Sequence, residues 1–242
     1  MMVSADRIPA PTMLLIGSMG RNSGKTVLAC EQISKLRRET PVVALKVSTI
    51  HSTEKRCLRG GEGCGVCTSL EGDFCITEEI DGSSGKDTAR MLASGASKVY
   101  WLRALKDHLA EGYGAFLELV DPSYPIVCES NSLGLVVEPG VFVMMKKRGS
   151  PELKASAEAA IERADQIAEF DGDNLLFDVN RISFSSNGFA LRRDITLVLL
   201  AGGGSRRMGR PKSMLEYRGG VMIEHLVSLL EPTFAEIIIS AN

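Results

Sequence analysis

The sequence lacks any segment that would carry the chain into or across a membrane. Its first residues, MMVSADRIPAPTMLLIGSMG, have neither the basic start nor the long apolar core of a signal peptide. No apolar run reaches the roughly 18 residues of a membrane-spanning helix. We therefore expect a cytoplasmic protein with no membrane partner.

An excess of charge of one sign is also missing. The 28 Lys and Arg residues nearly balance the 30 Asp and Glu residues, which leaves a net charge of -2. A chain without a basic surplus lacks the broad electrostatic footprint by which proteins bind nucleic acids. We therefore expect no nucleic-acid partner.

The composition that remains is that of a globular protein, with 44% hydrophobic and 24% charged residues. A length of 242 residues allows one or two domains with a sizeable core. The six cysteines accompany no export signal. They point to a reducing compartment, in which free thiols or metal ligands are more common than disulfides.

Short apolar runs alternate with segments of helical periodicity over about the first 190 residues. The expected strands are 13–17, 41–47, 98–102, 124–128, 140–145, 175–179 and 182–184, and the expected helices are 26–35, 87–95 and 153–170. This alternation predicts an α/β fold with a mainly parallel sheet. A fresh strand follows Arg192-Arg193-Asp194. It separates a domain at 1–193 from an incomplete Rossmann-like βαβ segment at 194–242.

A first glycine loop, GSMGRNSGKT at residues 17–26, lies between an expected strand and an expected helix. That is the context of a phosphate-binding P-loop, in which successive backbone N–H groups and the helix N-terminus attract an anion. The usual G-x-x-x-x-G-K-[ST] spacing is altered, because Met19 lies six residues before Lys25 and the glycine follows it. Lys25 would reach the phosphates and Thr26 would bind Mg²⁺, unless GKT occurs here by chance. The expected nucleotide-binding residues are Gly20, Asn22, Ser23, Gly24, Lys25 and Thr26.

A P-loop site also needs an acid at the end of a later apolar strand, where it can hold the magnesium ion. Glu129 follows the apolar run 126–128 and precedes polar residues. We expect Glu129 to bind Mg²⁺ with Thr26 and to be catalytic together with Lys25, the alternative being a solvated glutamate at a strand end. Asp87 is the other candidate acid, although a helix N-cap needs no catalytic role.

The order of these motifs resembles that of a known family. Asn22–Thr26, the K-D-T-x-R segment Lys86–Arg90 with Gly95-Ala96, and the strand-end acid Glu129 are similar to the MobB-type GTP-binding proteins of molybdenum cofactor maturation. The resemblance covers roughly residues 12–170 and implies a P-loop NTPase fold that binds GTP. The histidine-rich stretch of that family is reduced here to KVSTIH, at 46–51.

A cysteine-rich insert at 51–80 also departs from that family. Cys57, Cys64, Cys67 and Cys75 are spaced C-x₆-C-x₂-C-x₇-C, and glycines flank the central pair. Small residues between thiolates allow both to face one ion, so we expect Zn²⁺ or an iron–sulfur cluster, which spacing cannot separate. Uncoordinated or redox-active thiols are the alternative.

A second glycine loop occupies LVLLAGGGSRRMGRPK at residues 197–212. The string L-A-G-G-x-S-x-R-M-G-x-P-K resembles the MobA-type nucleotidyltransferases, which are molybdenum cofactor guanylyltransferases and their cytidylyl relatives. The resemblance implies that the Gly202-Gly203 backbone lies against a nucleobase and that basic side chains bind a triphosphate. The nucleotide-binding residues that it implies are Leu200, Ala201, Gly202, Gly203, Arg207 and Lys212.

Together the two resemblances imply a fused protein that binds GTP and transfers GMP from GTP to molybdopterin. Molybdoenzymes, other cofactor-maturation proteins and a second copy of the chain are further possible partners. The family's magnesium-binding aspartate lies beyond the segment present, so we expect a truncated chain that is inactive in transfer. One alternative is an adaptor GTPase with a vestigial transferase piece. Another is a dethiobiotin synthetase-like ligase joined to a cytidylyl or sugar nucleotidyltransferase.

Overall fold

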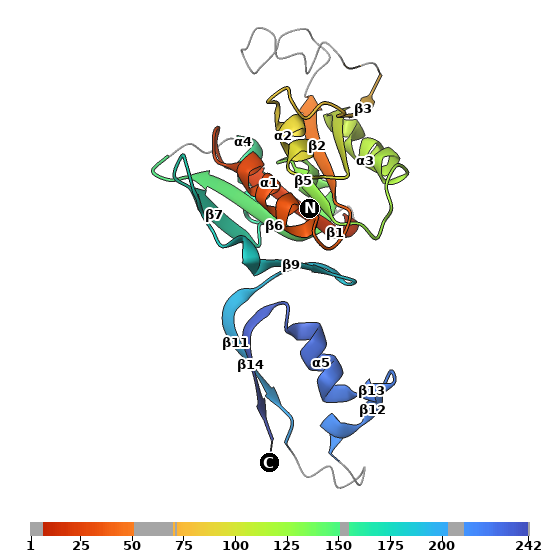
Figure 1. The fold of residues 1–242 in the computed structure, drawn as a ribbon, viewed down its shortest axis with the longest axis vertical. Coiled ribbons are helices and arrows are strands. Elements are labelled where there is room, and N and C mark those ends of the chain that lie inside the picture. Colours follow the sequence, from red (N-terminus) through yellow and green to blue (C-terminus); the bar gives the residue numbers. More distant parts are fainter. Residues whose placement is uncertain (1–6, 51–69, 71, 151–154, 203–210, 242) are drawn as a thin grey trace, which may run out of the picture. The chain divides into compact units, whose positions relative to one another are not determined.

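The computed structural model describes residues 7–50, 70, 72–150, 155–202 and 211–241 (Figure 1). The chain divides into two compact units. The first comprises Met1–Val179 and Phe184–Phe189, and the second comprises Asn180–Ser183 and Ala190–Asn242.

An eight-stranded sheet forms the centre of the first unit, with the strand order β3-β4-β2-β5-β1-β6-β7-β8. The strands are β1 (Ile8–Ser18), β2 (Val43–Ile50), β3 (Phe74–Glu78), β4 (Lys98–Leu105), β5 (Ile126–Glu129), β6 (Val137–Lys147), β7 (Gln166–Phe170) and β8 (Leu175–Leu176). The six central strands of this order, β4-β2-β5-β1-β6-β7, pair in parallel. The outer strands β3 and β8 each pair antiparallel with their neighbour. The prediction of an α/β fold with a mainly parallel sheet is confirmed.

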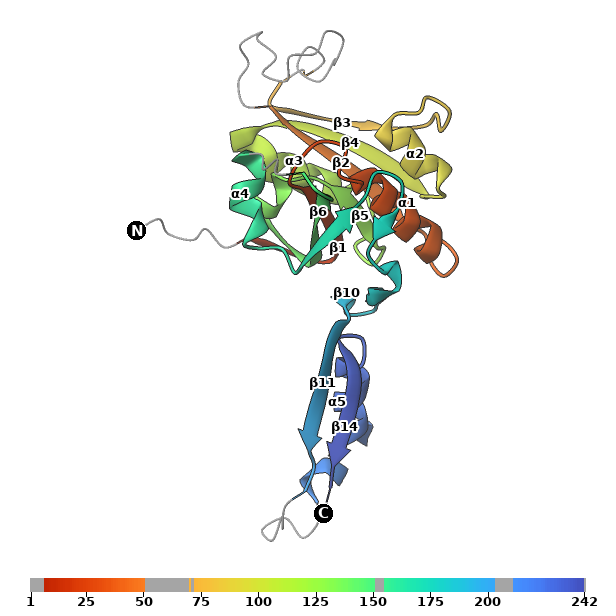
Figure 2. The same cartoon turned by 90° about the vertical axis from the view of Figure 1, so that its left-hand side faces the viewer.

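Helices cover both faces of this sheet. They are α1 (Lys25–Leu36), α2 (Asp87–Ala93), α3 (Leu109–Leu117) and α4 (Ala155–Ile161), with 3₁₀ turns at Lys106–His108, Leu133–Leu135 and Val179–Arg181. Figure 2 shows α1 and α2 on one side of the strands and α3 and α4 on the other. Among the described residues, no helix is both long and apolar enough to span a bilayer.

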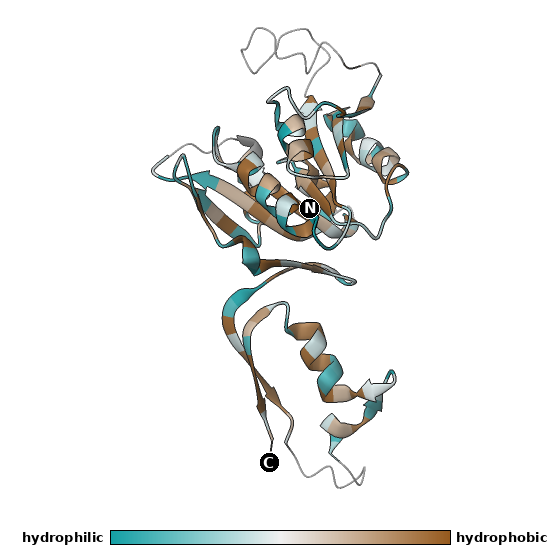
Figure 3. Cartoon of the chain, in the orientation of Figure 1, coloured by the Kyte–Doolittle hydropathy of each residue, from teal (hydrophilic) through white to brown (hydrophobic). Residues whose placement is uncertain are grey.

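The double covering explains why the central strands are apolar without alternation. In β1, residues 13–16 are all fully buried, since parallel strands in such a sheet have helices on both faces. Figure 3 shows the same concentration of apolar residues along the central strands. The core therefore lies on both faces of β1, β5 and β6, directly beneath the loop that follows β1.

The prediction of a helix over residues 153–170 is wrong for the second half of that segment. The helix α4 ends at Ile161, and β7 follows beside β6. Asp165 sets this change, because its N–H donates to the Phe142 carbonyl and its carboxylate accepts from the Phe142 N–H. Local periodicity suggested a helix, and pairing with a distant strand overrode it.

Besides β7, the strand β3 and the helix α3 of the first unit were not predicted, and one predicted strand was too long. The strand β3 lies within the segment assigned to the cysteine-rich insert and pairs antiparallel with β4. The helix α3 buries Leu109, Tyr113 and Phe116 at helical spacing. The strand expected at 175–179 is limited to β8. A turn at Asn187-Gly188 joins β9 (Ile182–Ser185) to β10 (Gly188–Leu191), and Gly188 has a φ of 99° there.

The second unit contains a short parallel pair of strands with a helix between them in sequence. Its elements are β11 (Arg193–Leu200), a 3₁₀ turn at Lys212–Met214, β12 (Glu216–Tyr217), β13 (Gly220–Val221), α5 (Met222–Leu230) and β14 (Phe234–Ser240). β11 and β14 pair in parallel, which confirms the expected βαβ arrangement. Val198 is 51% exposed and Leu200 is 83% exposed, so apolar side chains of this strand pair face solvent.

Candidate functional site

The first glycine loop, residues 17–26, connects the carboxyl end of β1 to the N-terminus of α1. Gly24 caps the helix in the left-handed region with φ 83°, and Asn22 has a φ of 50°. Left-handed residues in such a loop turn successive N–H groups toward one point, and the helix N-terminus adds a partial positive charge there. The loop backbone is therefore built to attract an anion.

The start of this loop is fixed to the segment after β5. The Ser18 N–H donates to Asn131 Oδ1 at 2.7 Å, and Asn131 Nδ2 donates to the Ser18 carbonyl at 2.8 Å. This reciprocal pair explains why a polar residue follows the β5 strand end, and it holds the loop next to Glu129.

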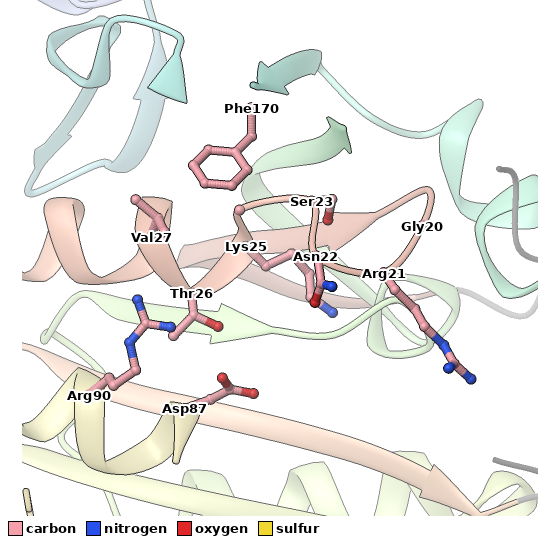
Figure 4. A pocket seen from close by; sticks show the side chains of 11 residues that line it. Gly20, Arg21, Asn22, Ser23, Lys25, Thr26, Val27, Asp87, Arg90 and Phe170 are labelled. Atoms are coloured by element: carbon pink, nitrogen blue, oxygen red, sulfur yellow. The ribbon is translucent and has the colours of Figure 1, made fainter. Parts of the chain in front are cut away.

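A pocket of about 450 Å³ lies over the loop. Residues 20–27 line it, together with Asp87 and Arg90 of α2 and Phe170 at the end of β7. Figure 4 shows the Phe170 ring on one side of the loop and the two α2 side chains on the other. Gly20, Asn22, Ser23, Gly24, Lys25 and Thr26 thus all reach the same pocket, as their sequence spacing predicts.

Two carboxylates converge on Thr26. The Thr26 hydroxyl acts to lower the pKa of both acids, Glu129, 3% exposed at the end of β5, and Asp87, the first residue of α2. Burial raises the pKa of Glu129 against the opposing effects of Lys25 and Thr26. Partial burial also acts to raise the pKa of Asp87, but Lys46, Thr26 and Lys25 together outweigh this and leave that pKa lowered.

These groups have the donor set of a hard divalent cation. Two carboxylates and a hydroxyl supply oxygen ligands, which Mg²⁺ prefers. Glu129 Oε1 is buried and has no hydrogen-bond partner among the described residues. A buried carboxylate oxygen without a partner is unfavourable unless a ligand completes it. The residues present therefore fit a magnesium ion beside Lys25.

The cysteine prediction falls mainly on residues that the structure does not describe. Cys57, Cys64 and Cys67 lie outside the described ranges. Cys75 lies on β3, half-buried, and its Sγ accepts a hydrogen bond from Arg103 at 3.3 Å. In the described part of the chain, no three His, Cys, Asp or Glu side chains cluster as metal ligands would. The zinc or iron–sulfur site stays a prediction from spacing.

The second glycine loop is described at its two ends. Leu200 ends β11, and Ala201 and Gly202 follow it, whereas Gly203 and Arg207 lie outside the described residues. Lys212 is exposed and begins a 3₁₀ turn, and Ser213 Oγ donates to the Ala201 carbonyl at 3.4 Å. Ser213 thus joins the 3₁₀ turn at Lys212–Met214 to the end of β11.

Four lining residues of the pocket were not predicted as site residues, namely Arg21, Val27, Arg90 and Phe170. Arg90 carried a sequence signal, because it lies three residues after Asp87 and therefore on the same face of α2. Phe170 carried none, since its place at the pocket depends on the pairing of β7 with β6.

The fold and the pocket define the first unit as an α/β protein with a ligand pocket at the carboxyl edge of a parallel sheet, where such sheets bind ligands. Comparison with known proteins concerns the second unit. Residues 197–242 match the family described as "MobA-like NTP transferase domain".

Three relatives illustrate the similarity of this C-terminal region. A probable molybdenum cofactor guanylyltransferase of Natranaerobius thermophilus is 45% identical over 49 residues, which are 20% of this chain and 24% of the relative. The probable molybdenum cofactor guanylyltransferase of Pelotomaculum thermopropionicum is 51% identical over 47 residues, which are 19% of this chain and 23% of the relative. The molybdenum cofactor guanylyltransferase of Shewanella amazonensis is 47% identical over 49 residues, which are 20% of this chain and 25% of the relative. The chain thus spans about a quarter of the length of these relatives. No solved structure matches the chain.

Proposed function

We propose that residues 1–193, which include the first unit, are a P-loop domain that binds GTP and Mg²⁺. The observation that carries the proposal is the convergence of Lys25, Thr26, Glu129 and Asp87 at the N-terminus of α1. The backbone N–H groups of the loop would hold the phosphates, and Lys25 would neutralise their outer charge. Thr26 and the two carboxylates would hold the ion, which supplies further charge neutralisation when bound.

We further propose that residues 194–242 are part of a nucleotidyltransferase domain and that the protein acts in molybdenum cofactor biosynthesis. The support is the similarity of this region to named guanylyltransferases. In the proposed reaction, a phosphate oxygen of molybdopterin forms a bond to the α-phosphorus of GTP. The bond from that phosphorus to the β-phosphate oxygen breaks, and pyrophosphate leaves. Arg207 and Lys212 would bind the triphosphate, and the backbone of Leu200–Gly203 would lie against the base.

The choice of base is tested by competition. Calorimetric titration of the full chain with GTP, ATP and CTP is expected to give the tightest binding with GTP. Lys212→Ala is expected to leave the GTP affinity of the first glycine loop unchanged within a factor of two, because this exposed side chain lies in the other unit. Equal affinity for all three nucleotides would reject the guanine assignment. A loss of all GTP binding in Lys212→Ala would place the principal site in the second unit instead.

Glu129→Gln tests the cation site. The substitution keeps the shape of the side chain and removes one ligand charge. GTP affinity measured with Mg²⁺ is therefore expected to fall about 10- to 100-fold, in line with the roughly 1.5–3 kcal/mol of a contact to a charged group. Affinity measured with EDTA is expected to change much less. Folding stability should be unchanged or higher, because a buried charge is removed.

The matched control is Glu118→Gln, at an exposed position just after α3. It removes the same charge and should leave both affinities as they are. If Glu129→Gln bound GTP with the same magnesium dependence as the unmodified chain, Glu129 would not be a cation ligand.

A further inference from the structure

We propose that Arg90 is a second nucleotide-binding cation, which contacts the phosphates from α2 across the pocket from the loop. The proposal rests on the nucleotide site proposed above for the first glycine loop. It gives a role to the arginine of the K-D-T-x-R segment, of which the proposed cation site uses only Asp87.

The position of the side chain is the first argument. Arg90 lines the same pocket as Thr26, Val27 and Asp87. Figure 4 shows its guanidinium pointing from α2 toward Thr26 and Val27, at the first turn of α1. Its charge also acts on the Cys30 thiol, which lies one turn further along α1 than Thr26. The guanidinium therefore lies beside the N-terminal turn that a bound phosphate would approach.

The absence of another partner is the second argument. Arg90 is exposed, and within the described ranges its guanidinium forms no ion pair or hydrogen bond. The nearest acid on its own helix, Asp87, is instead paired with Lys46 of β2. The guanidinium N–H groups of such an arginine, at the edge of a pocket, are suited to phosphate, because they can donate two parallel hydrogen bonds to two phosphate oxygens.

The third argument is that α2 is held in place before any ligand binds. Its first turn is tied to β2 by the ion pair of Asp87, and the Thr88 hydroxyl donates to Glu79 Oε2 at 2.8 Å. Its last turn is tied to α1, because Ser34 Oγ donates to the Ser94 carbonyl at 3.3 Å. The Arg90 backbone therefore has a fixed position relative to the loop, so little ordering is needed for the side chain to reach a ligand.

The geometry also indicates which phosphates Arg90 serves. In a P-loop the lysine reaches the outer phosphates, and the backbone holds the inner ones. Arg90 lines the pocket together with Thr26 and Val27 of the first turn of α1, and its guanidinium points toward them (Figure 4). We therefore expect it to contact the inner phosphates, which GTP and GDP share.

The experiment measures the affinity of the full chain for GTP and GDP by calorimetry, with Arg90→Ala, Arg90→Lys and Arg38→Ala. Arg90→Ala is expected to weaken both nucleotides by about tenfold, in proportion to a lost contact with a charged group. Arg90→Lys should recover part of the loss, because it keeps the charge but not the fork. Arg38 is an exposed arginine at the opposite end of α1, so its removal should have no effect.

The outcomes separate this proposal from the one on which it rests. If the unmodified chain binds neither nucleotide, the proposed nucleotide site fails and Arg90 loses its role with it. If the chain binds GTP through Lys25 but Arg90→Ala and Arg90→Lys both bind within a factor of two of it, the role of Arg90 alone is overturned. A loss confined to GTP would also overturn it, since the inner phosphates are common to both ligands. Far-UV circular dichroism of each variant confirms that the comparison is made on folded protein.

Discussion

Lys25→Ala is expected to weaken GTP binding about 100-fold or more, the equivalent of about 2.7 kcal/mol. Lys25 is the first residue of α1 and lines the pocket beside Glu129 and Thr26. Its ammonium group would be the charge that faces the outer phosphates, and hydrogen bonds to charged groups contribute about 1.5–3 kcal/mol each. The fold should persist, since the side chain is not part of the core. Titration with GTP in the presence of Mg²⁺ measures the effect.

The control for this loss is Lys98→Ala. Lys98 is exposed at the amino end of β4, whereas the loop lies at the carboxyl edge of the same parallel sheet. The Lys98→Ala substitution removes an equal charge from the same unit and should leave GTP affinity unchanged. An equal loss of affinity in both variants would mean that net charge, rather than a contact at the loop, governs binding.

Gly24→Ala is expected to destabilise the first unit by about 3 kcal/mol and to abolish nucleotide binding. Two effects add. An alanine in the left-handed region costs about 1–2 kcal/mol. A Cβ at Gly24 would also lie 2.6–2.9 Å from the Cβ, Cγ and Cδ2 atoms of Phe170. Overpacking of this kind typically costs about 1–3 kcal/mol, because backbone as well as side chain must move.

Gly149→Ala separates the two effects. Gly149 has a φ of 73°, close to the 83° of Gly24, but a Cβ there would meet no atom within 4 Å. It should therefore show only the conformational cost of about 1–2 kcal/mol. Urea unfolding followed by fluorescence of Trp101, the single tryptophan of the chain, reports on the first unit selectively.

The double variant Gly24→Ala with Phe170→Ala tests the contact itself. Removing the ring should relieve the clash, so the double variant should be less destabilised than the sum of the two single changes. If Gly24→Ala were no more destabilising than Gly149→Ala, the close approach of Phe170 to the loop would be wrong.

The sequence alone was sufficient for the features that depend on neighbouring residues. The loop at 17–26 was recognisable because its glycine, lysine and threonine are adjacent in the chain, and both flanking elements are confirmed. The mainly parallel α/β fold followed from apolar runs that alternate with helical segments, since buried strands need apolar side chains on both faces. Glu129 was found because a polar residue at the end of a buried strand breaks a local pattern.

Only the tertiary structure decided what faces the loop. Asp87 and Arg90 come from a helix more than 60 residues along the chain, and Phe170 comes from a strand that local periodicity had suggested was helical. Their approach depends on strand order and on pairs such as Lys46 with Asp87 and Asp165 with Phe142. Such contacts join residues far apart in sequence, so no short pattern encodes them. The sequence determined where phosphates could bind, and packing of the sheet decided which side chains would complete the site.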